Sequence, residues 1–169
     1  PGDPTFPTVM TTYHMVEHWM SGSMTRTIPW LVGLQPRSFI EISPELAESI
    51  GVTTGGYVSV RSPRNEIQVR ALVTPRLRIG VIEGRQASIA GFVCSGYKGI
   101  VCDPITNDLS PADMAGDGLI PSSKSFVVKI DKPDMNKVEK FNEYPVEYPA
   151  GMSEPIPDTP WAAQPEGRN

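Results

Sequence analysis

Proline limits how long any regular element can run in this chain. The 169 residues include 18 Pro and 15 Gly, and six of the prolines stand between residues 145 and 165. Proline lacks the backbone N–H that helix interiors and central strands use, so it interrupts both. We therefore expect short elements joined by turns, with mainly β-structure and an extended, Pro-rich C-terminal arm over residues 133–169. Disorder is the alternative for the last ten residues of this arm.

Several runs before that arm carry the signals of regular structure. A short helix is predicted from Ser43-Pro44 to Gly51, because Ser caps helices, Pro suits the first helical position and Gly ends them. Leu46 and Ile50 lie four residues apart and should face inward. The alternating and β-rich runs predict strands over residues 37–43, 57–60, 66–73, 86–92 and 125–130. The second and third of these strands are expected to form a hairpin, and residues 94–124 are expected to be a long loop.

The overall composition excludes some classes of function. The formal net charge is −4, whereas nucleic-acid binders usually present a basic field. No apolar run approaches the length that spans a membrane. Two cysteines, Cys94 and Cys102, are too few for a structural zinc site; free thiols are the simpler interpretation and a disulfide is the alternative. The sequence leaves the cellular compartment open.

Residues 11–26 concentrate polar chemistry. They hold two His, one Glu, one Arg, a Gly and six Ser, Thr or Tyr hydroxyls, and a packed apolar core could not satisfy so many donors and acceptors. Trp19 and Met24 make the same segment too apolar for a solvated linker. We interpret it as a wall that contacts a polar, anionic ligand, with Trp19 and Met24 covering an apolar face.

Other readings of this segment are weaker. His14, Glu17 and His18 fit the H-x-x-E-H pattern of zinc peptidases, in which both His share one helix face and the Glu serves as base. The β-prone residues before His14 and the Gly22 that follows disfavour the helix this needs. Surface histidines without a function are a second alternative. The sequence contains no G-x-S-x-G elbow, P-loop or G-x-G-x-x-G pattern.

Two later residues suit the same kind of ligand. The amide of Asn107 carries donors and acceptors that fit the edge of a heterocycle. Lys124, just before the last expected strand, suits a phosphate or another anion. Taken singly, Asn107 is more simply a turn residue and Lys124 a solvated charge.

In this order the motifs resemble a known family. Segment 12–26, with Glu17-His18-Trp19 followed by residues 21–26, resembles the start of the C-terminal dinucleotide-binding domain of molybdopterin oxidoreductases. The likeness is greatest to formate dehydrogenase catalytic subunits and next to periplasmic nitrate reductases. The strand-to-helix step at 39–44, the strand at 56–60, residues 107–110 and Lys124 follow in family order. The resemblance covers about residues 8–132.

The resemblance implies a six-stranded double-psi β-barrel over residues 11–132, after an extended lead-in of residues 1–10 and before the Pro-rich arm. It also implies bound molybdopterin guanine dinucleotide, in the bis form that holds Mo or W. The residues that match the family's cofactor-contacting positions are Thr12, Tyr13, His14, Glu17, His18, Ser21, Gly22, Ser23, Met24, Thr25, Asn107 and Lys124. We expect no catalytic residue and no protein ligand of the metal in this chain. That ligand and the iron–sulfur cysteines would lie upstream.

The chain departs from the family at some positions. His14 stands where the family often has Arg, so the charge there becomes pH-dependent. The loop at residues 91–97 lacks the His and Trp that formate dehydrogenases commonly carry. The Pro-rich arm extends past the family's usual end.

The resemblance further implies that the chain is the C-terminal part, or a small subunit, of a larger oxidoreductase and is inactive alone. Interconversion of formate and CO2 is the leading reaction, and nitrate reduction is the second. The expected partners are the upstream domains or large subunit and an electron-transfer subunit, with no nucleic acid and no membrane contact. A non-catalytic cofactor-binding subunit is the alternative of another class, ahead of the zinc hydrolase.

Overall fold

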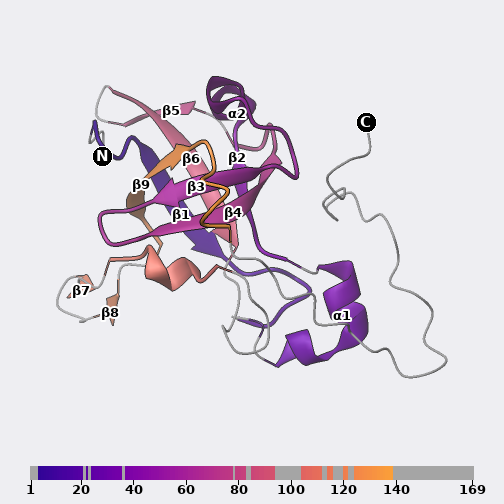
Figure 1. The fold of residues 1–169 in the computed structure, drawn as a ribbon. Coiled ribbons are helices and arrows are strands. Elements are labelled where there is room, and N and C mark those ends of the chain that lie inside the picture. Colours follow the sequence, from indigo (N-terminus) through magenta and orange to yellow (C-terminus); the bar gives the residue numbers. More distant parts are fainter. Residues whose placement is uncertain are drawn as a thin grey trace.

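Strands dominate the computed structural model of this chain, and most of them form a curled sheet with the helices at its periphery (Figure 1). The prediction of a mainly β fold is thereby confirmed. The structure describes residues 4–20, 22, 24–35, 37–77, 79–82, 85–93, 104–111, 114–115, 120–121 and 124–138.

Within these residues, seven strands pair in the order β1-β9-β3-β4-β2-β6-β5. They are β1 (Thr8–Tyr13), β2 (Phe39–Ile42), β3 (Tyr57–Arg61), β4 (Glu66–Val73), β5 (Ile79–Ile82), β6 (Arg85–Val93) and β9 (Phe126–Asp131). Strand β1 also pairs with β6, so the sheet curls back on itself. A separate ribbon joins β7 (Met114–Ala115) and β8 (Ile120–Pro121).

The sheet is mixed, with two parallel pairings among antiparallel ones. Strands β1 and β6 are parallel, with Thr8 opposite Ser88, and β2 and β4 are parallel, with Phe39 opposite Arg70. The hairpins β3–β4 and β5–β6 are antiparallel, as are the pairings of β9 with β1 and β3. Parallel neighbours need a crossover connection, and the chain supplies one between β2 and β4 that contains a helix and β3.

The core follows from alternation along the strands. In β1, Thr8, Met10 and Thr12 are buried and their neighbours are partly exposed, as expected where successive side chains point to opposite faces. The fully or nearly fully buried apolar side chains that fill the inside of the curl include Met10, Ile40, Ile42, Val58, Val60, Val69, Val128 and Ile130. For residues 79–82 and 85–93 the structure describes the backbone and not the side chains.

Helix α2 (Pro44–Ile50) forms as its end signals predict. The Ser43 side chain accepts a hydrogen bond from the Leu46 amide, Pro44 occupies the first helical position, and Gly51 closes the helix with φ 68°. A residue at that φ is strained unless it is Gly or Asn. Leu46 and Ile50 pack against the core, which confirms that they face inward.

The strands expected from the sequence are confirmed, with shifts of one or two residues at their ends. Strand β1 begins at Thr8, within the expected lead-in. Helix α1 (Pro29–Leu34) and strand β5 were not expected. Helix α1 is short, and Gly33 interrupts its apolar run.

Parts of the prediction fall on residues that are not described. Of the expected 94–124 loop, the structure describes a 3-10 turn, η2 (Thr106–Asp108), and the β7–β8 ribbon. Cys94 and Cys102 and the arm beyond residue 138 lie outside the described residues. Among the described residues, no helix has the length and apolar character needed to cross a membrane. The double-psi barrel topology stays a prediction.

Candidate functional site

The carboxyl end of β1 lies beside the segment that leads into β9. The ammonium group of Lys124 donates a hydrogen bond to the backbone carbonyl of Thr12, with 2.7 Å between Nζ and the oxygen. The Thr12 side chain is buried at 7% exposure. Two predicted site residues that are 112 positions apart are thus in direct contact. The cation of Lys124 is held at the edge of the sheet where the polar segment 14–24 begins.

Tyr13, the last residue of β1, places its hydroxyl in a buried position. The phenol oxygen makes no hydrogen bond of standard geometry with the described residues. Burial, followed by the negative charge of nearby Glu41, raises the pKa of Tyr13 well above its ordinary value. The hydroxyl therefore stays protonated at physiological pH, with the Glu41 carboxylate near enough to accept its proton.

Glu41 lies on β2, between the core residues Ile40 and Ile42 but on the opposite face of the strand. Its side chain is only 7% exposed and forms an ion pair with Arg76, whose side chain is 72% exposed. A buried carboxylate needs such a partner. Sequence reasoning missed Glu41 and Arg76; a single charged residue between two core positions was the signal that could have indicated them.

His18 holds the segment after β1 against α1. Its Nε2 lies 2.8 Å from the Gln35 carbonyl at the end of α1, and its Nδ1 lies 3.1 Å from the Thr25 hydroxyl. Because a carbonyl oxygen only accepts, we assign the proton to Nε2. The Trp19 amide also donates to the Thr25 hydroxyl. The imidazole is 1% exposed, so its role within the chain is to position this loop.

Gly22 makes the tight turn that brings this loop back toward Arg26. It has φ 79°, and its amide donates to the Trp19 carbonyl at 2.8 Å. A Cβ at Gly22 would lie 2.8 Å from Nε of Arg26. Arg26 is 5% exposed, and its amide in turn donates to the Gly22 carbonyl. The turn therefore requires glycine both for its backbone conformation and for the close approach of Arg26.

The local geometry does not suit the zinc reading. Residues 14–19 form coil and bends where the H-x-x-E-H pattern needs a helix. His14 is exposed and His18 is buried, so the two side chains do not share an open face. No group of three or more candidate metal ligands is found among the described residues. The β-prone residues before His14 prevail over the helical spacing of the motif.

Several predicted residues reach the surface of this loop. His14 is exposed, Glu17 is partly exposed, and Trp19 and Met24 are each 64% exposed. Their exposure leaves these two apolar side chains accessible at the surface of the loop. Ser21 and Ser23 lie outside the described residues.

Asn107 stands apart from this loop in the described contacts. It is an exposed residue of η2, and its backbone carbonyl accepts a hydrogen bond from the Ser110 hydroxyl at 3.2 Å. Arg64, in the β3–β4 turn, donates to the Ser110 carbonyl at 3.0 Å. These contacts fix η2 against the hairpin. Among the described residues, no hydrogen bond joins Asn107 to Thr12, Lys124 or His18.

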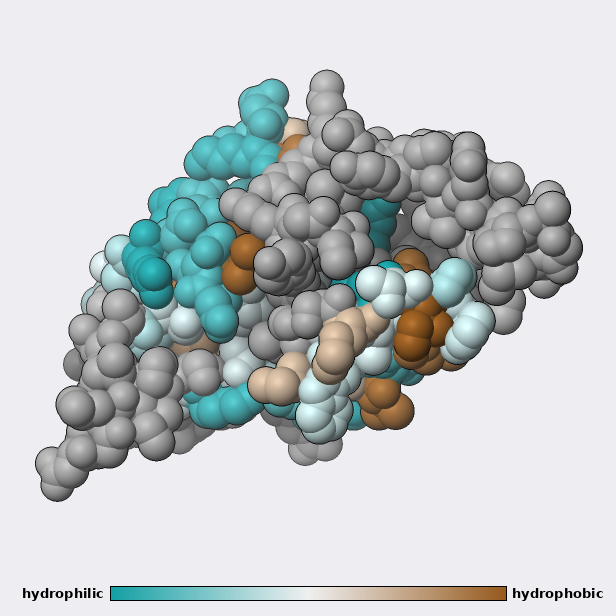
Figure 2. All heavy atoms as spheres, turned by 90° about the horizontal axis from the view of Figure 1, so that it is seen from below, coloured by the Kyte–Doolittle hydropathy of each residue, from teal (hydrophilic) through white to brown (hydrophobic). Residues whose placement is uncertain are grey.

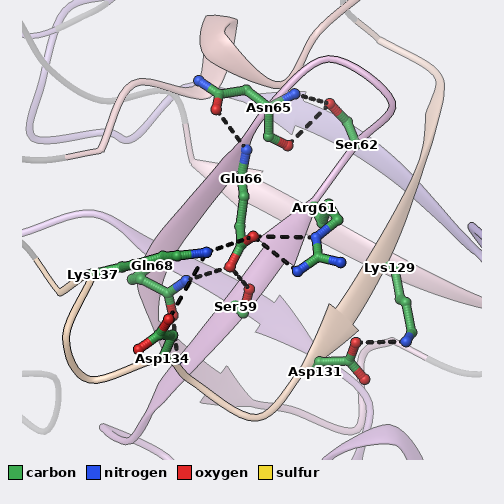
Figure 3. Close-up of polar contacts among 10 residues, drawn as sticks. All are labelled: Ser59, Arg61, Ser62, Asn65, Glu66, Gln68, Lys129, Asp131, Asp134 and Lys137. Atoms are coloured by element: carbon green, nitrogen blue, oxygen red, sulfur yellow. Dashed lines mark hydrogen bonds and ion pairs between the residues drawn. The ribbon is translucent and has the colours of Figure 1, made fainter.

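Glu66, at the start of β4, accepts hydrogen bonds from four side chains (Figure 3). These come from Ser59 at 2.8 Å, Arg61 at 2.9 Å, Gln68 at 3.0 Å and Lys137 at 3.2 Å. Burial alone would raise the pKa of Glu66, but the bonds from Ser59, Lys137 and Arg61 outweigh it and lower the pKa to about 2. Lys137 thereby fastens the segment after β9 to the β3–β4 hairpin.

A cavity of about 130 Å³ adjoins this network. Glu66, Gln68 and Lys137 line one part of it, and Ile105 and Asp108, which flank or belong to η2, line another. No sequence pattern indicates this cluster, because its members come from separate strands and from the end of the described chain. Since the carboxylate of Glu66 is fully engaged, the network has a structural role.

The sequence of this chain matches the molydopterin dinucleotide binding domain family over residues 8–118. It is 37% identical to formate dehydrogenase 2 subunit alpha (cytochrome c-553) of Nitratidesulfovibrio vulgaris over 133 residues, and 33% identical to formate dehydrogenase subunit alpha of Megalodesulfovibrio gigas over 138 residues. These alignments cover 78% and 77% of this chain but only 13% of each relative.

The fold is also similar to that of acetylene hydratase from Pelobacter acetylenicus, with a TM-score of 0.60 and 10% sequence identity. This likeness covers 76% of the present chain and 18% of the other. At this level of identity the likeness concerns the fold alone.

Proposed function

Because the chain belongs to the molydopterin dinucleotide binding domain family, we propose that it is the part of a formate dehydrogenase-like oxidoreductase that closes over a molybdopterin guanine dinucleotide. The cofactor would be bis-molybdopterin guanine dinucleotide with Mo or W. The observation that carries this proposal is a family match that runs from β1 through η2, and thus includes both the polar loop and Asn107. In keeping with it, the curled sheet would be a double-psi barrel.

The side chains at the end of β1 fit such a group. The Tyr13 hydroxyl is a buried, protonated donor without a hydrogen bond of standard geometry in the described chain. Exposed His14, Asn107 and Lys124 add donors, acceptors and positive charge. A pterin, a guanine and a pyrophosphate need this mixture, because their edges pair with amides and hydroxyls and their phosphates pair with cations.

The chain's own residues would bind and orient the group. Tyr13 and Lys124 would hold it at the carboxyl end of β1, with help from Thr12, and His14, Glu17, Met24 and the loop serines Ser21 and Ser23 would line its edge. His18, Gly22 and Thr25 keep that loop in shape. When bound, the metal-pterin group supplies the redox chemistry. The protein supplies position, charge and exclusion of water.

Interconversion of formate and CO2 is the reaction we favour, since the relatives at 31–37% identity over most of this chain are named formate dehydrogenases. The chain covers about one-eighth of the length of those relatives. The rest of the same subunit, or a separate large subunit, would supply the metal's protein ligand and the iron–sulfur cluster. An electron-transfer subunit would be a further partner. Turnover by this chain alone is therefore not expected.

The test measures cofactor content in the complete subunit. Asn107→Ala and Lys124→Gln should each lower bound guanine nucleotide and Mo or W several-fold per subunit. Asn136→Ala and Lys129→Gln are matched controls, because both residues are exposed and outside the loop and η2. The readouts are elemental analysis and chromatography of the nucleotide released by acid. Equal nucleotide and metal content in test and control variants would contradict the proposal.

A further inference from the structure

Helix α1 has an unusual composition for a surface element. Its six residues read Pro-Trp-Leu-Val-Gly-Leu, and none of them is buried. Trp30 is 64% exposed and Leu34 is 45% exposed, and the two lie four residues apart on one face of the helix. A helix that is apolar all round normally lies inside a protein. Helix α1 therefore presents a face that the described chain does not cover.

The sequence on both sides of α1 carries no exposed charge for several residues. Between Arg26 and Arg37 every residue is uncharged, and Arg26 itself is buried. The His18 contacts with Thr25 and the Gln35 carbonyl hold the loop that bears exposed Trp19 against this helix. Seen from below, brown hydrophobic residues gather on the side of the molecule that carries α1 (Figure 2).

We propose that the face of α1 formed by Trp30 and Leu34 is a docking surface for an apolar patch elsewhere in the same polypeptide, in the part of the subunit outside these 169 residues. This inference rests on the proposed function, since the relatives in which such a domain occurs are about six times as long as this chain. A domain that closes over a cofactor must also close against the rest of its subunit. The surface beside the polar loop is where that contact would form.

The chemistry of this face disfavours the cofactor as its occupant. Trp30 and Leu34 offer aromatic and aliphatic surface, and Pro29 at the start of the helix has no N–H to donate. A dinucleotide with a pyrophosphate needs donors and cations, which the neighbouring loop and Lys124 offer and α1 lacks. An apolar protein surface fits α1 better.

The size of the face disfavours a second copy or a transient partner. A stable interface between separate proteins buries about 800 Å² and roughly 20–30 residues on each side, with a polar rim. One six-residue helix without nearby charges offers far less. Covalent connection raises the effective concentration of the two surfaces, so a small apolar contact suffices within one polypeptide.

The test places a photoreactive benzoylphenylalanine at Trp30 in the complete subunit. We expect irradiation to form an intramolecular cross-link, identified by mass spectrometry, between α1 and a peptide outside residues 1–169. The same probe at Met135, which is 54% exposed and far along the sequence, is the matched control and should not give that cross-linked peptide. Cross-links to a second copy, to another subunit, or to no protein at all would overturn the proposal.

A second measurement does not depend on the probe. In the complete subunit, Trp30→Glu and Leu34→Glu should accelerate amide hydrogen exchange in residues 28–35 at least tenfold, whereas Met135→Glu should leave it unchanged. Unchanged exchange in the first two variants would count against docking. Guanine nucleotide content separates the two claims: nucleotide present without cross-linking refutes docking alone, and wild-type subunit without nucleotide refutes the proposed function.

Discussion

Gly22 shows at the scale of one residue how the loop after β1 depends on backbone conformation. We predict that Gly22→Ala destabilises the fold by about 1–3 kcal/mol, because a side chain at φ 79° is strained and its Cβ would meet Arg26. Gly33→Ala is the control, since a Cβ there contacts nothing within 4 Å and Ala favours helix. Urea unfolding measures both. Equal midpoints for the two variants would contradict the strain argument.

Glu66 is a single residue that makes the stability of the fold depend on pH. Its pKa is lowered to about 2, so the folded state binds its proton less readily than the unfolded state does. The contribution of Glu66 is therefore fully present above the ordinary carboxyl pKa and is lost as pH falls through about 2.

We expect Glu66→Gln to lower the free energy of unfolding by about 1 kcal/mol at neutral pH, since partly exposed ionic contacts are screened. The difference from wild type should shrink as pH falls from about 5 to 2. Glu48→Gln, an exposed change on α2, is the control and should show no such trend. The measurement is the free energy of unfolding of wild type and variant across this pH range. A difference between them that does not change with pH would refute the role of the Glu66 charge.

At the scale of elements, His18 joins the polar loop to α1. We predict that His18→Ala loosens the packing of the polar loop against α1. The imidazole bridges the Thr25 hydroxyl and the Gln35 carbonyl from a buried position, and the variant loses both contacts. Hydrogen exchange should rise at least tenfold over the described residues from Trp19 to Gln35 while β3 and β4 stay protected. His14→Ala, an exposed change in the same loop, should have little effect. Similar exchange in both variants would mean that His18 does not hold the loop.

The elements with strong local signals were the ones that sequence could predict. Helix α2 had a cap, a first-turn proline and a closing glycine, and polar and apolar residues alternate in β4 from Glu66 to Ala71. Helix α1 was missed because Gly33 and an all-apolar run give no amphipathic period. Residues 8–10 of β1 were expected as extended chain and not as a paired strand, since the pairing with β6 and β9 is set by distant residues.

The candidate site also has a part that the sequence predicted and a part that it did not. Residue types in the loop and their order predicted where polar chemistry would gather, and the contact between Lys124 and Thr12 agrees with that grouping. Glu41, Arg76 and the Glu66 network were not predictable, because each depends on side chains brought together by strand register. The internal role of His18 could not be read from the motif, since it requires the position of the Gln35 carbonyl.

At the scale of the whole molecule, β1 closes the curl of the sheet by pairing with both β9 and β6. Met10, at its centre, is fully buried and stands opposite both Ala90 of β6 and Phe126 of β9. Because one strand supports both neighbours, we expect the sheet to unfold as a single cooperative unit.

We predict that Met10→Ala costs about 2–5 kcal/mol and keeps a single transition by fluorescence and circular dichroism. Val9→Ala, on the same strand but partly exposed, should cost clearly less. Urea titrations monitored with both probes test this. Transitions that separate between the probes would show that the two sides of the sheet unfold independently.

The pairing of β1 also has a consequence for biosynthesis. Thr8 leaves the ribosome well before its β9 partner Val128, which is about 120 residues further along the chain. At elongation rates of about 5–20 residues per second, the first strand waits roughly 6–24 seconds for that neighbour. During that interval its unpaired edge needs protection from other nascent chains, so maturation of this unit is expected to depend on translation speed and on holding chaperones.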